Sequence, residues 1–403
     1  MGGYILNRVL SGILTLFLFV TLLFFLASAV IPGDFVTSLG IMPADAAAAL
    51  RAELGLDQPL FAQYLTWLKS IFTLSLGDSF GRGPVWEAVR DAMAPTLVVL
   101  GIGLLVAFIL GGWLGRTAGY REGSVFSGSA TIVAIVCLTI FPPALAVAME
   151  QGVQRYAGWF GLGTIAELDE TAWVGGEMTV AGVLWRTFLV FAVTALILWL
   201  IETLVWRWGR RRVPRWAFLV SMVGIPLLIW SRMGIADLVF DLAGAMSLLV
   251  VAVVFLTFGE ILLVTKAAMD DVMMEDYVMV ARAKGLPERQ VRDRHAARAA
   301  LLPVLSRFTV AIPYFLTGLV ILEVVFGQSQ QSGGLPITPT LMRFSAPAGL
   351  GTLLFDALSS QDTPLLLGAL LVVGVLTLSI RIVLDVIHAA LDPRIRFGHA
   401  NER

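Results

Sequence analysis

The sequence is short of the side chains on which most enzyme active sites depend. It has three histidines and one cysteine in 403 residues. The cysteine, Cys137, lies in an apolar run, so neither an intrachain disulfide nor a cysteine-based metal site can form. His295, His388 and His399 are far apart, and no His-Glu-x-x-His pattern is present. The composition therefore gives little support to a metal-dependent hydrolase, and we expect no metal site.

Lysine is equally rare. The chain has only Lys69, Lys266 and Lys284, and none of them follows a glycine. A P-loop requires Gly-x-x-x-x-Gly-Lys-Ser/Thr, in which the lysine reaches the phosphates of the nucleotide. A Gly-x-Ser-x-Gly nucleophile turn is also missing. We therefore expect no enzyme activity, no catalytic residues and no bound cofactor in this chain.

Charged residues make up only 14% of the chain, whereas hydrophobic residues reach 58%, which indicates an integral membrane protein. Crossing about 30 Å of hydrocarbon takes about 20 apolar residues. Eight stretches approach this length, near 9–31, 95–115, 125–148, 183–206, 217–231, 244–266, 304–327 and 364–389. We predict an all-α, polytopic membrane helix bundle with six core spans. The fourth and fifth stretches form a further inserted pair within residues 149–240.

The first span could be confused with a cleaved signal peptide, because it ends in Ala27-Ser28-Ala29. Its apolar core of about 18 residues is longer than the roughly 7–15 residues of a signal peptide. We therefore expect residues 1–31 to remain as the first transmembrane span. Residues 32–94 follow as an amphipathic segment outside the membrane, with Gly55 as a helix stop.

Arginine is distributed unevenly along the chain. It is concentrated in the segments 116–124, 207–216 and 267–303 and in the tail after residue 389. Since positively charged loops stay on the cytoplasmic side, this pattern places both termini in the cytoplasm. It also requires that the inserted pair cross together or not at all. The predicted organisation is completed by a transmembrane domain over 95–392, which includes the cytoplasmic loop 267–303, and a cytoplasmic tail over 393–403.

The cytoplasmic loop has strong local signals for a helix, a sharp turn and a second helix. Helix-forming residues continue to Lys284, and Gly285 offers the left-handed conformation that commonly ends a helix. Leu286-Pro287-Glu288 then restarts a helix that runs through Pro303 into the next span. A solvated basic loop would explain the arginines but not the small residues at Ala281, Ala283 and Gly285. These small residues permit the close approach of another surface.

The same loop resembles the coupling loop of binding-protein-dependent ABC importer permeases, in the form found in the dipeptide/oligopeptide permease family. The resemblance rests on Asp276-Tyr277-Val278, the run Ala281–Leu286 and the closing Leu301–Pro303. It implies that the loop contacts a cytoplasmic ATPase. The residues that match the family pattern, and to which the resemblance assigns this coupling role, are Asp276, Tyr277, Ala281, Arg282, Ala283, Lys284, Gly285, His295, Arg298 and Pro303.

The resemblance extends over nearly the whole chain. Similar blocks are Ile31–Asp34, Leu54–Leu60, Glu323–Phe326, Gly349–Gly351 and Leu391–Arg396. The early outer segment is typical of the B-type subunit of the permease pair. The sequence departs from the family pattern in four places. These are Met279-Val280 in the coupling loop, Ala299 where the family often has asparagine, and additional residues within 149–240 and within 328–346.

The resemblance implies a type I transmembrane domain of an ATP-driven ABC importer for di- or oligopeptides or related small solutes. Its expected partners are a homologous C-type permease, two cytoplasmic ABC ATPases, an extracytoplasmic solute-binding protein and the lipid bilayer, without nucleic acid. The expected location is the cytoplasmic (inner) membrane of a bacterium or archaeon. Glu323 and Phe326 are candidate translocation-pathway residues, since they fall near the outer end of the seventh stretch, although Glu323 could instead be a satisfied structural acid.

Two other classes of function are compatible with the composition. A secondary transporter driven by an ion gradient would use acids such as Glu260 and Glu323, but we find no clear inverted repeat or broken helix. A membrane scaffold or receptor would bind a solute-binding protein without an ATPase. The coupling-loop pattern favours the ABC permease over both.

Overall fold

A computed structural model describes residues 2–30, 34–40, 42–73, 75–160, 179–209, 214–331 and 348–391. The first elements are α1 (Gly2–Val30), α2 (Phe35–Ser38), α3 (Ala44–Glu53), α4 (Leu60–Phe72), β1 (Asp78–Ser79), β2 (Gly83–Pro84), α5 (Val85–Tyr120), α6 (Val125–Thr139) and α7 (Pro142–Phe160). They are followed by α9 (Val180–Gly209), α10 (Arg215–Met233), α11 (Ala236–Met273), α12 (Asp276–Ala283), α13 (Glu288–Gln290), the π-helical η2 (Val291–Ala296), α14 (Ala297–Gln331), α15 (Leu350–Ser359) and α16 (Thr363–Leu391). The predicted tail 393–403 and most of the insertion 328–346 lie outside the described residues.

The predicted helical membrane bundle is confirmed. Among the described residues, six helices are long and apolar enough to cross a membrane, namely Leu10–Ala29, Val85–Tyr120, Val180–Val205, Ala236–Met273, Glu288–Gly327 and Thr363–Val386. The predicted third span is not straight, because Val125–Thr139 and Pro142–Val153 meet at 103°. Pro142 and Pro143 break the helix there, since proline removes a backbone donor and clashes with the preceding turn.

Two further spans differ from the sequence-based expectation. The helix expected from residue 95 begins already at Val85, so Pro95 lies inside it. The predicted fifth span is the helix α10, but its apolar stretch, Val220–Met233, is shorter than the six long helices. By length and composition the described residues therefore support six spans, or seven with the bent pair, where the sequence suggested six core spans and an inserted pair.

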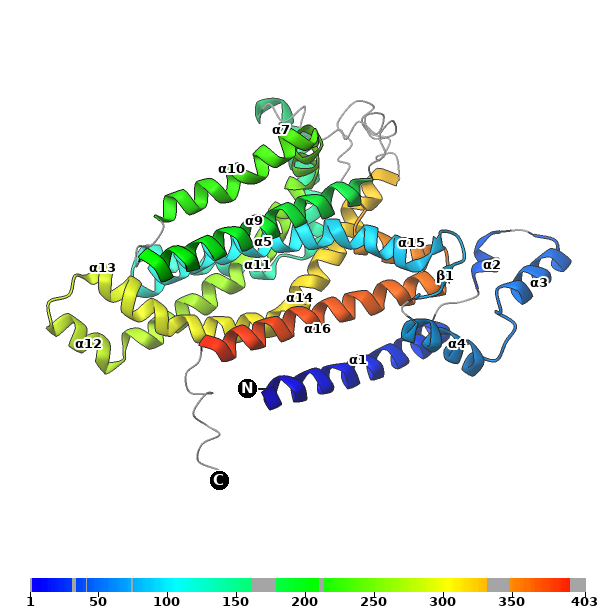
Figure 1. Cartoon of the computed structure of the whole chain (residues 1–403), viewed down its shortest axis with the longest axis horizontal. Helices are drawn as coiled ribbons and strands as arrows, with labels where there is room; N and C mark the ends of the chain where they lie inside the picture. The colour runs from blue at the N-terminus through cyan, green and yellow to red at the C-terminus, as the bar shows by residue number, and fades with distance from the viewer. Residues whose placement is uncertain are drawn as a thin grey trace, which may run out of the picture.

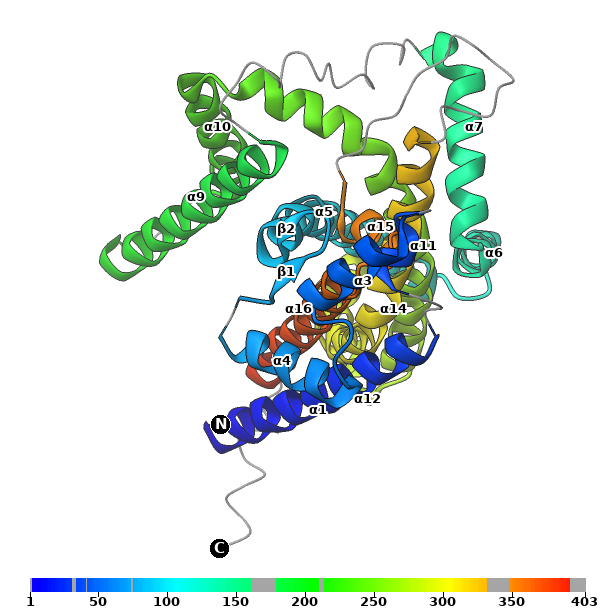
Figure 2. The ribbon, with the colours of Figure 1, turned by 90° about the vertical axis from the view of Figure 1, so that its right-hand side faces the viewer.

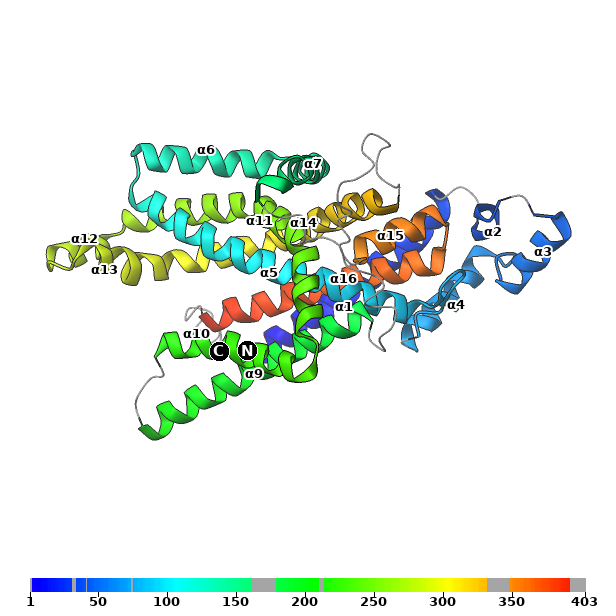
Figure 3. The ribbon, with the colours of Figure 1, turned by 90° about the horizontal axis from the view of Figure 1, so that it is seen from above.

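The bundle has two distinct ends. The α12–η2 hairpin (residues 276–296) protrudes at one end, which we call the hairpin end, and α2–α4 lie with α15 at the opposite end, which we call the α15 end (Figure 1). Helix α1 starts toward the hairpin end and α16 finishes toward it (Figure 1). Helices α9 and α10 run antiparallel beside each other, so the end of α9 and the start of α10 also lie toward the hairpin end (Figure 3). The predicted arginine-rich segments that the structure describes are thus gathered at one end.

The inserted pair, which is formed by α9 and α10, lies away from the rest of the bundle for most of its length (Figure 2). Only the start of α9 enters the main core, through Ala181, Val183 and Leu184. Farther along, Phe191 of α9 packs edge-on against Trp230 of α10, with ring centroids 5.3 Å apart. The pair is therefore fastened to the core near the α15 end and otherwise packs on itself.

The centre of the bundle is the contact between α5 and α11. Along α5, Gly103, Ala107, Gly111, Gly115 and Gly119 recur every fourth residue and are all buried. A Cβ added at Gly115 would lie 2.6 Å from the carbonyl oxygen of Leu262, so the two backbones touch. This small-residue stripe permits the close helix packing that holds membrane bundles together. On the opposite side, α11 packs as closely on α6, where its own Gly259 lies against Ala134.

A second apolar cluster forms the core at the α15 end. It combines Phe24 of α1, Trp67 of α4 and Val89 of α5 with residues of α15 and α16. The amphipathic segment 32–94 is thereby attached to the bundle, because α4 buries Tyr64 and Trp67 in this cluster. The segment also includes the short antiparallel pair β1–β2 and the first turns of α5.

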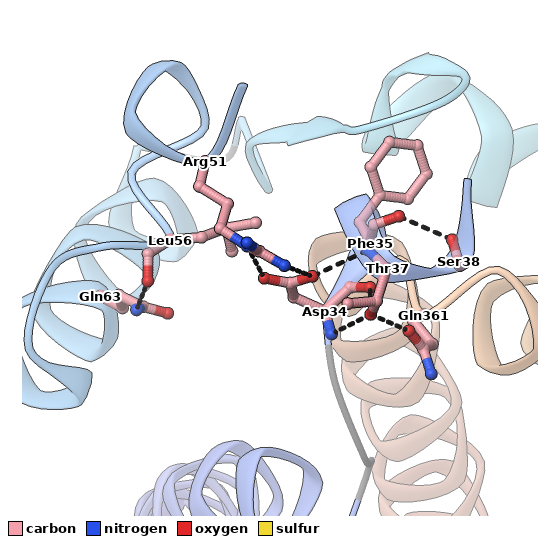
Figure 4. A network of polar contacts seen from close by, with 8 residues as sticks. All are labelled: Asp34, Phe35, Thr37, Ser38, Arg51, Leu56, Gln63 and Gln361. Atoms are coloured by element: carbon pink, nitrogen blue, oxygen red, sulfur yellow. Dashed lines mark hydrogen bonds and ion pairs between the residues drawn. The ribbon is translucent and has the colours of Figure 1, made fainter. Parts of the chain in front are cut away.

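Asp34 organises the polar part of the outer segment (Figure 4). Its side chain accepts the backbone N–H of Thr37 at 2.9 Å and so caps α2, and Arg51 of α3 donates to it at 2.6 Å. The hydroxyl of Thr37 in turn donates to Gln361, next to α16, at 3.0 Å. The Arg51 guanidinium is the main reason why the pKa of Asp34 is lowered from 3.8. Asp34 therefore ties α2 to α3, a connection that the sequence did not reveal.

The glycine stripe gives a first prediction. Gly115→Leu should lower the stability of the purified protein, because overpacking costs about 1–3 kcal/mol even where side chains can adjust, and here backbone atoms block the new side chain. Gly112→Leu is the matched control, since a Cβ there would meet nothing within 4 Å. The measurement is the thermal aggregation midpoint in detergent. Equal midpoints for the two variants would show that the α5–α11 contact is looser than described.

Asp34 gives a second prediction, on pH. A carboxyl group with a lowered pKa favours the folded state when it is ionised, and this contribution is lost as the pH falls through the lowered pKa. Asp34→Asn should therefore speed hydrogen exchange in α2 and α3 at neutral pH, and the difference from wild type should vanish once the pH is well below 3.8. Asp45→Asn, on exposed α3 surface, should have little effect. A difference that does not depend on pH would contradict this assignment.

Candidate functional site

The α12–η2 hairpin contains most of the residues that the sequence singled out. Helix α12 begins after Glu275, which has extended backbone angles, and Asp276 occupies its first turn, where a negative charge is favourable. The helix ends at Lys284, and Gly285 adopts φ +73°, in the left-handed region that glycine enters freely. The backbone N–H of Leu286 then reaches back to the carbonyl of Ala281 at 3.4 Å. This is the closing bond of a Schellman turn.

The hairpin has a small apolar core of its own. Val278, Ala281 and Val291 are buried together, with Leu286 packed against them. The hydrophobic contact from Leu286 back onto α12 commonly accompanies a Schellman turn. Ala281, expected on the surface that meets a partner, is therefore part of the internal packing and only 7% exposed. Its small side chain lets the two arms of the hairpin approach each other.

The second arm of the hairpin is continuous with a long membrane helix. Pro287 caps α13, which passes through η2 into α14, and Pro303 lies inside α14. The predicted helix, sharp turn and second helix are confirmed. The π-helical turn over 291–296 was not anticipated. Such turns have no clear sequence signal and are frequent at functional sites.

Polar contacts fasten the second arm to the end of α5. The hydroxyl of Tyr120 donates to Glu288, and the guanidinium of Arg292 lies 5.6 Å from the centre of the Tyr120 ring. Asp293 lies 3.5 Å from Nε of Arg116 on α5 and accepts from Arg292 at 2.8 Å. We call Tyr120, Glu288, Asp293 and Arg116 the α5 tether. The sequence analysis missed it because its members are distant in the chain and each alone resembles an ordinary surface residue.

Most of the predicted coupling residues are exposed on the outside of the hairpin. The exposed members are Asp276, Tyr277, Arg282, Ala283, Lys284, Gly285, His295, Arg298 and Pro303. They lie on α12, the turn, η2 and the first part of α14. Arg282 also pairs with Glu288 across the turn, at 3.2 Å. Their role in coupling stays a prediction, but the structure leaves them accessible.

Apolar side chains lie among these exposed residues. Met274, Met279 and Val280 are 80%, 68% and 51% exposed. We call these exposed side chains and Tyr277, which lie on and just before α12, the α12 face. Partial burial raises the pKa of the Tyr277 phenol from its usual value of 10.0. Methionine and tyrosine are enriched at protein interfaces. Met279 and Val280 are also two of the positions where the sequence departs from the family pattern.

Glu323 and Phe326, the candidate pathway residues, lie near the α15 end and are each 3% exposed. Phe326 belongs to the main core. Glu323 accepts hydrogen bonds from Thr96 on α5 and from the backbone of Gly351 on α15, both at 2.7 Å. The structure thus brings together two of the blocks that the sequence analysis noted separately. It does not test whether either residue lines a pathway.

Metal chemistry finds no support in the described ranges 2–30, 34–40, 42–73, 75–160, 179–209, 214–331 and 348–391. Within them no three His, Cys, Asp or Glu side chains are grouped closely enough to hold a metal ion. Cys137 is buried in α6. In this part of the chain an exposed hairpin lies at one end of the bundle, and closely packed helices lie at the other.

Comparison with known proteins agrees with these features. A protein of Brucella suis biovar 1 (strain 1330), provisionally named as a peptide permease, is 27% identical over 399 residues and covers 98% of each chain. The dipeptide transport system permease protein DppB of Escherichia coli (strain K12) is 27% identical over 402 residues, again with 98% of each chain covered.

Two family models match different parts of the chain. Residues 1–98 match the N-terminal model of binding-protein-dependent transport system membrane components. Residues 103–397 match the model of the binding-protein-dependent transport system inner membrane component. Since this second match covers well over half of the sequence, the chain belongs to the family of binding-protein-dependent transport system inner membrane components.

Proposed function

We propose that this permease is the B-type subunit of an ATP-driven ABC importer for di- or oligopeptides or related small solutes. The peptide substrate class is supported by the two relatives, whose names refer to peptide or dipeptide transport and which align with nearly the full chain. The coupling mechanism is supported mainly by the α12–η2 hairpin. It is a folded, exposed hairpin with an apolar face, joined directly to a long membrane helix.

The proposed orientation places the hairpin end in the cytoplasm. Helix α1 begins, α16 finishes, α9 ends and α10 begins toward this end (Figure 1). The described parts of the segments 116–124, 207–216 and 267–303, which are rich in arginine, belong to the same end. Positive charge is retained on the cytoplasmic side of a membrane. Segment 34–73 and α15 then face the extracytoplasmic side, where a solute-binding protein would deliver the solute.

The partners follow from the family and the proposed orientation. A homologous C-type permease would complete the transmembrane unit, and two cytoplasmic ATPases would bind the hairpins of the two permeases. An extracytoplasmic solute-binding protein would dock at the α15 end. The α12 face suits an ATPase groove, because apolar side chains gain about 25 cal/mol per Å² when they leave water, and polar residues such as Arg282 and Lys284 surround the face.

In this proposal the hairpin transmits the movement of the ATPases by two routes. One is the continuous backbone from η2 into α14. The other is the α5 tether, which connects the hairpin to the helix at the centre of the bundle. When nucleotide binding brings the ATPases together, α14 and α5 would move with the hairpin. The bundle would change from open toward the cytoplasm to open toward the outside, with all hydrolysis occurring in the partner chains.

Docking at the α12 face can be tested by enlarging Ala283, an exposed small residue on the same helix. Ala283→Trp should prevent ATPase binding and abolish solute-stimulated ATP hydrolysis, because the bulky ring blocks the docking surface. Since Ala283 is exposed, the fold and membrane insertion should remain intact. The measurements are co-purification with the ATPase chains and ATP hydrolysis in proteoliposomes. Ala48→Trp, on exposed surface of α3, is the matched control. Normal ATPase binding by Ala283→Trp, or solute uptake without any ATPase, would refute the proposal.

The α5 tether can be tested separately from docking. Tyr120→Phe removes only the hydroxyl that bonds Glu288, and a hydrogen bond to a charged group contributes about 1.5–3 kcal/mol. The ATPases should therefore still bind and hydrolyse ATP, while solute uptake per ATP falls. The ratio of uptake to hydrolysis measures this effect. Tyr314→Phe, at an exposed tyrosine of α14, is the control. An unchanged ratio in Tyr120→Phe would mean that α5 takes no part in coupling.

A further inference from the structure

Helix α15 is held in place at both ends by buried carboxylates. Glu323 lies at its N-terminal end and Asp362 lies just after its C-terminal end, and their exposed fractions are 3% and 2%. Asp362 accepts the hydroxyl of Ser79 at 2.6 Å and the backbone N–H of Leu365 at 3.1 Å. It therefore connects the end of α15 to β1 and to the start of α16. Glu323 makes the corresponding connection to α5 and α14.

The hydrogen bonds of Glu323 join three helices at one point. Oε1 accepts the hydroxyl of Thr96 on α5, and Oε2 accepts the backbone N–H of Gly351 on α15. The oxygen of the same Thr96 hydroxyl accepts the backbone N–H of Leu350 at 2.9 Å. Two free donors at the start of α15 are thus satisfied, as every helix N-terminus requires. Each member needs the others, because a buried carboxylate without partners is strongly destabilising.

Glycine is required around this carboxylate. A Cβ at Gly349 would overlap the carboxylate of Glu323, and a Cβ at Gly351 would overlap the carbonyl of Val320 on α14. A Cβ at Gly327 would overlap the side chain of Thr352. The Gly349-Leu350-Gly351 block of the sequence is therefore explained by the close seating of α15 on α14.

We propose that Glu323, Thr96 and Gly351 form a latch that holds α15 across the outer end of the bundle while the permease faces the cytoplasm. In this assignment Glu323 is a positioning residue that controls opening and does not bind the solute. Both of its oxygens already accept hydrogen bonds from the protein. The latch rests on the proposed function, which makes the α15 end the outer one and requires α5 and α14 to separate there when the transporter opens outward.

The latch connects the two helices that also meet at the opposite end of the bundle. Helix α5 carries Thr96 in its first half and Tyr120 at its last residue, and at a rise of 1.5 Å per residue these positions are about 36 Å apart. The second arm of the hairpin consists of α13 and η2 and continues into α14. Glu323 lies near the far end of α14. A movement of the hairpin that tilts α14 against α5 therefore acts directly on the Thr96–Glu323 bond.

The test uses a cysteine placed beneath α15. Val89 of α5 is 0% exposed and belongs to the same apolar cluster as Leu353 and Ala357 of α15. Val89→Cys, in a Cys137→Ala background, is treated from outside with a membrane-impermeant maleimide in right-side-out vesicles that contain the complete transporter. Thr96→Val removes the hydroxyl of the latch, whereas Thr96→Ser keeps it and is the matched control.

Thr96→Val should increase the labelling rate of Val89→Cys roughly tenfold or more. A tenfold shift in an equilibrium corresponds to about 1.4 kcal/mol, and a hydrogen bond to a charged group contributes at least this much. Thr96→Ser should label at the wild-type rate. Ala300→Cys, 2% exposed near the hairpin end, is labelled in inside-out vesicles, because the reagent cannot reach that end from outside. It reports general loosening and should stay slow.

Three results would overturn the latch. They are an unchanged rate at Val89→Cys, an equal rise at Ala300→Cys, and an increased KM for uptake in Thr96→Val without faster labelling. The last would assign Glu323 to the solute. The labelling reports the latch alone, whereas ATP-dependent solute uptake by the wild-type vesicles tests the proposed function. Failure of the latch proposal can therefore be distinguished from failure of the proposed function.

Discussion

The backbone contact between α5 and α11 is the constraint on which the rest of the structure depends. In a membrane the lipid tails are as apolar as the helices, so helix association has to come from close packing and from polar contacts between helices. The buried stripe from Gly103 to Gly119 supplies that packing over four helical repeats. With α5 fixed in this way, its two ends become reference points, Thr96 toward α15 and Tyr120 toward the hairpin.

Polar groups are placed sparingly against this apolar background, and they occur where helices have to meet in one register. Asp34, Asp362 and Glu323 each satisfy a helix N-terminus and at the same time contact a distant segment. A carboxylate used in this way fixes both the start of a helix and its neighbour. The apolar surfaces provide the attraction between helices, and these few carboxylates determine which arrangement is adopted. The α5 tether does the same for the hairpin, although its residues are more exposed.

The features that the sequence predicted are those with local causes. The break at Gly285 and the restart at Pro287 follow from the conformations open to glycine and proline, and the long helices follow from their length and apolarity. The bend after Thr139 had a visible signal in Pro142 and Pro143, but counting apolar residues alone treated the region as one span. The start of α5 at Val85 was missed because the count of consecutive apolar residues began only at residue 95. Apolar contacts of Val85 and Val89 stabilise the earlier turns.

The sequence predicted only part of the candidate site, because only some of its features have local causes. Exposure of Ala283 and Arg282 could be expected from an amphipathic helix, whereas Ala281 lies inside because the arms of the hairpin fold back on each other. Contacts such as Thr96 with Glu323 or Tyr120 with Glu288 join residues far apart in the chain, and a single sequence has no signal for them.

The hairpin separates the residues that fold it from the residues that it displays. Val278, Ala281, Leu286 and Val291 hold the two arms together, while Met279, Val280 and Ala283 lie exposed on the same short helix. Substitutions on the displayed side leave the internal packing untouched, so they carry little penalty in stability. During evolution this surface is therefore free to follow changes in a partner, and the departure from the family pattern at Met279 and Val280 falls on that side. Under the proposed docking of an ATPase on this face, exchanging these few side chains would redirect the permease to a different ATPase.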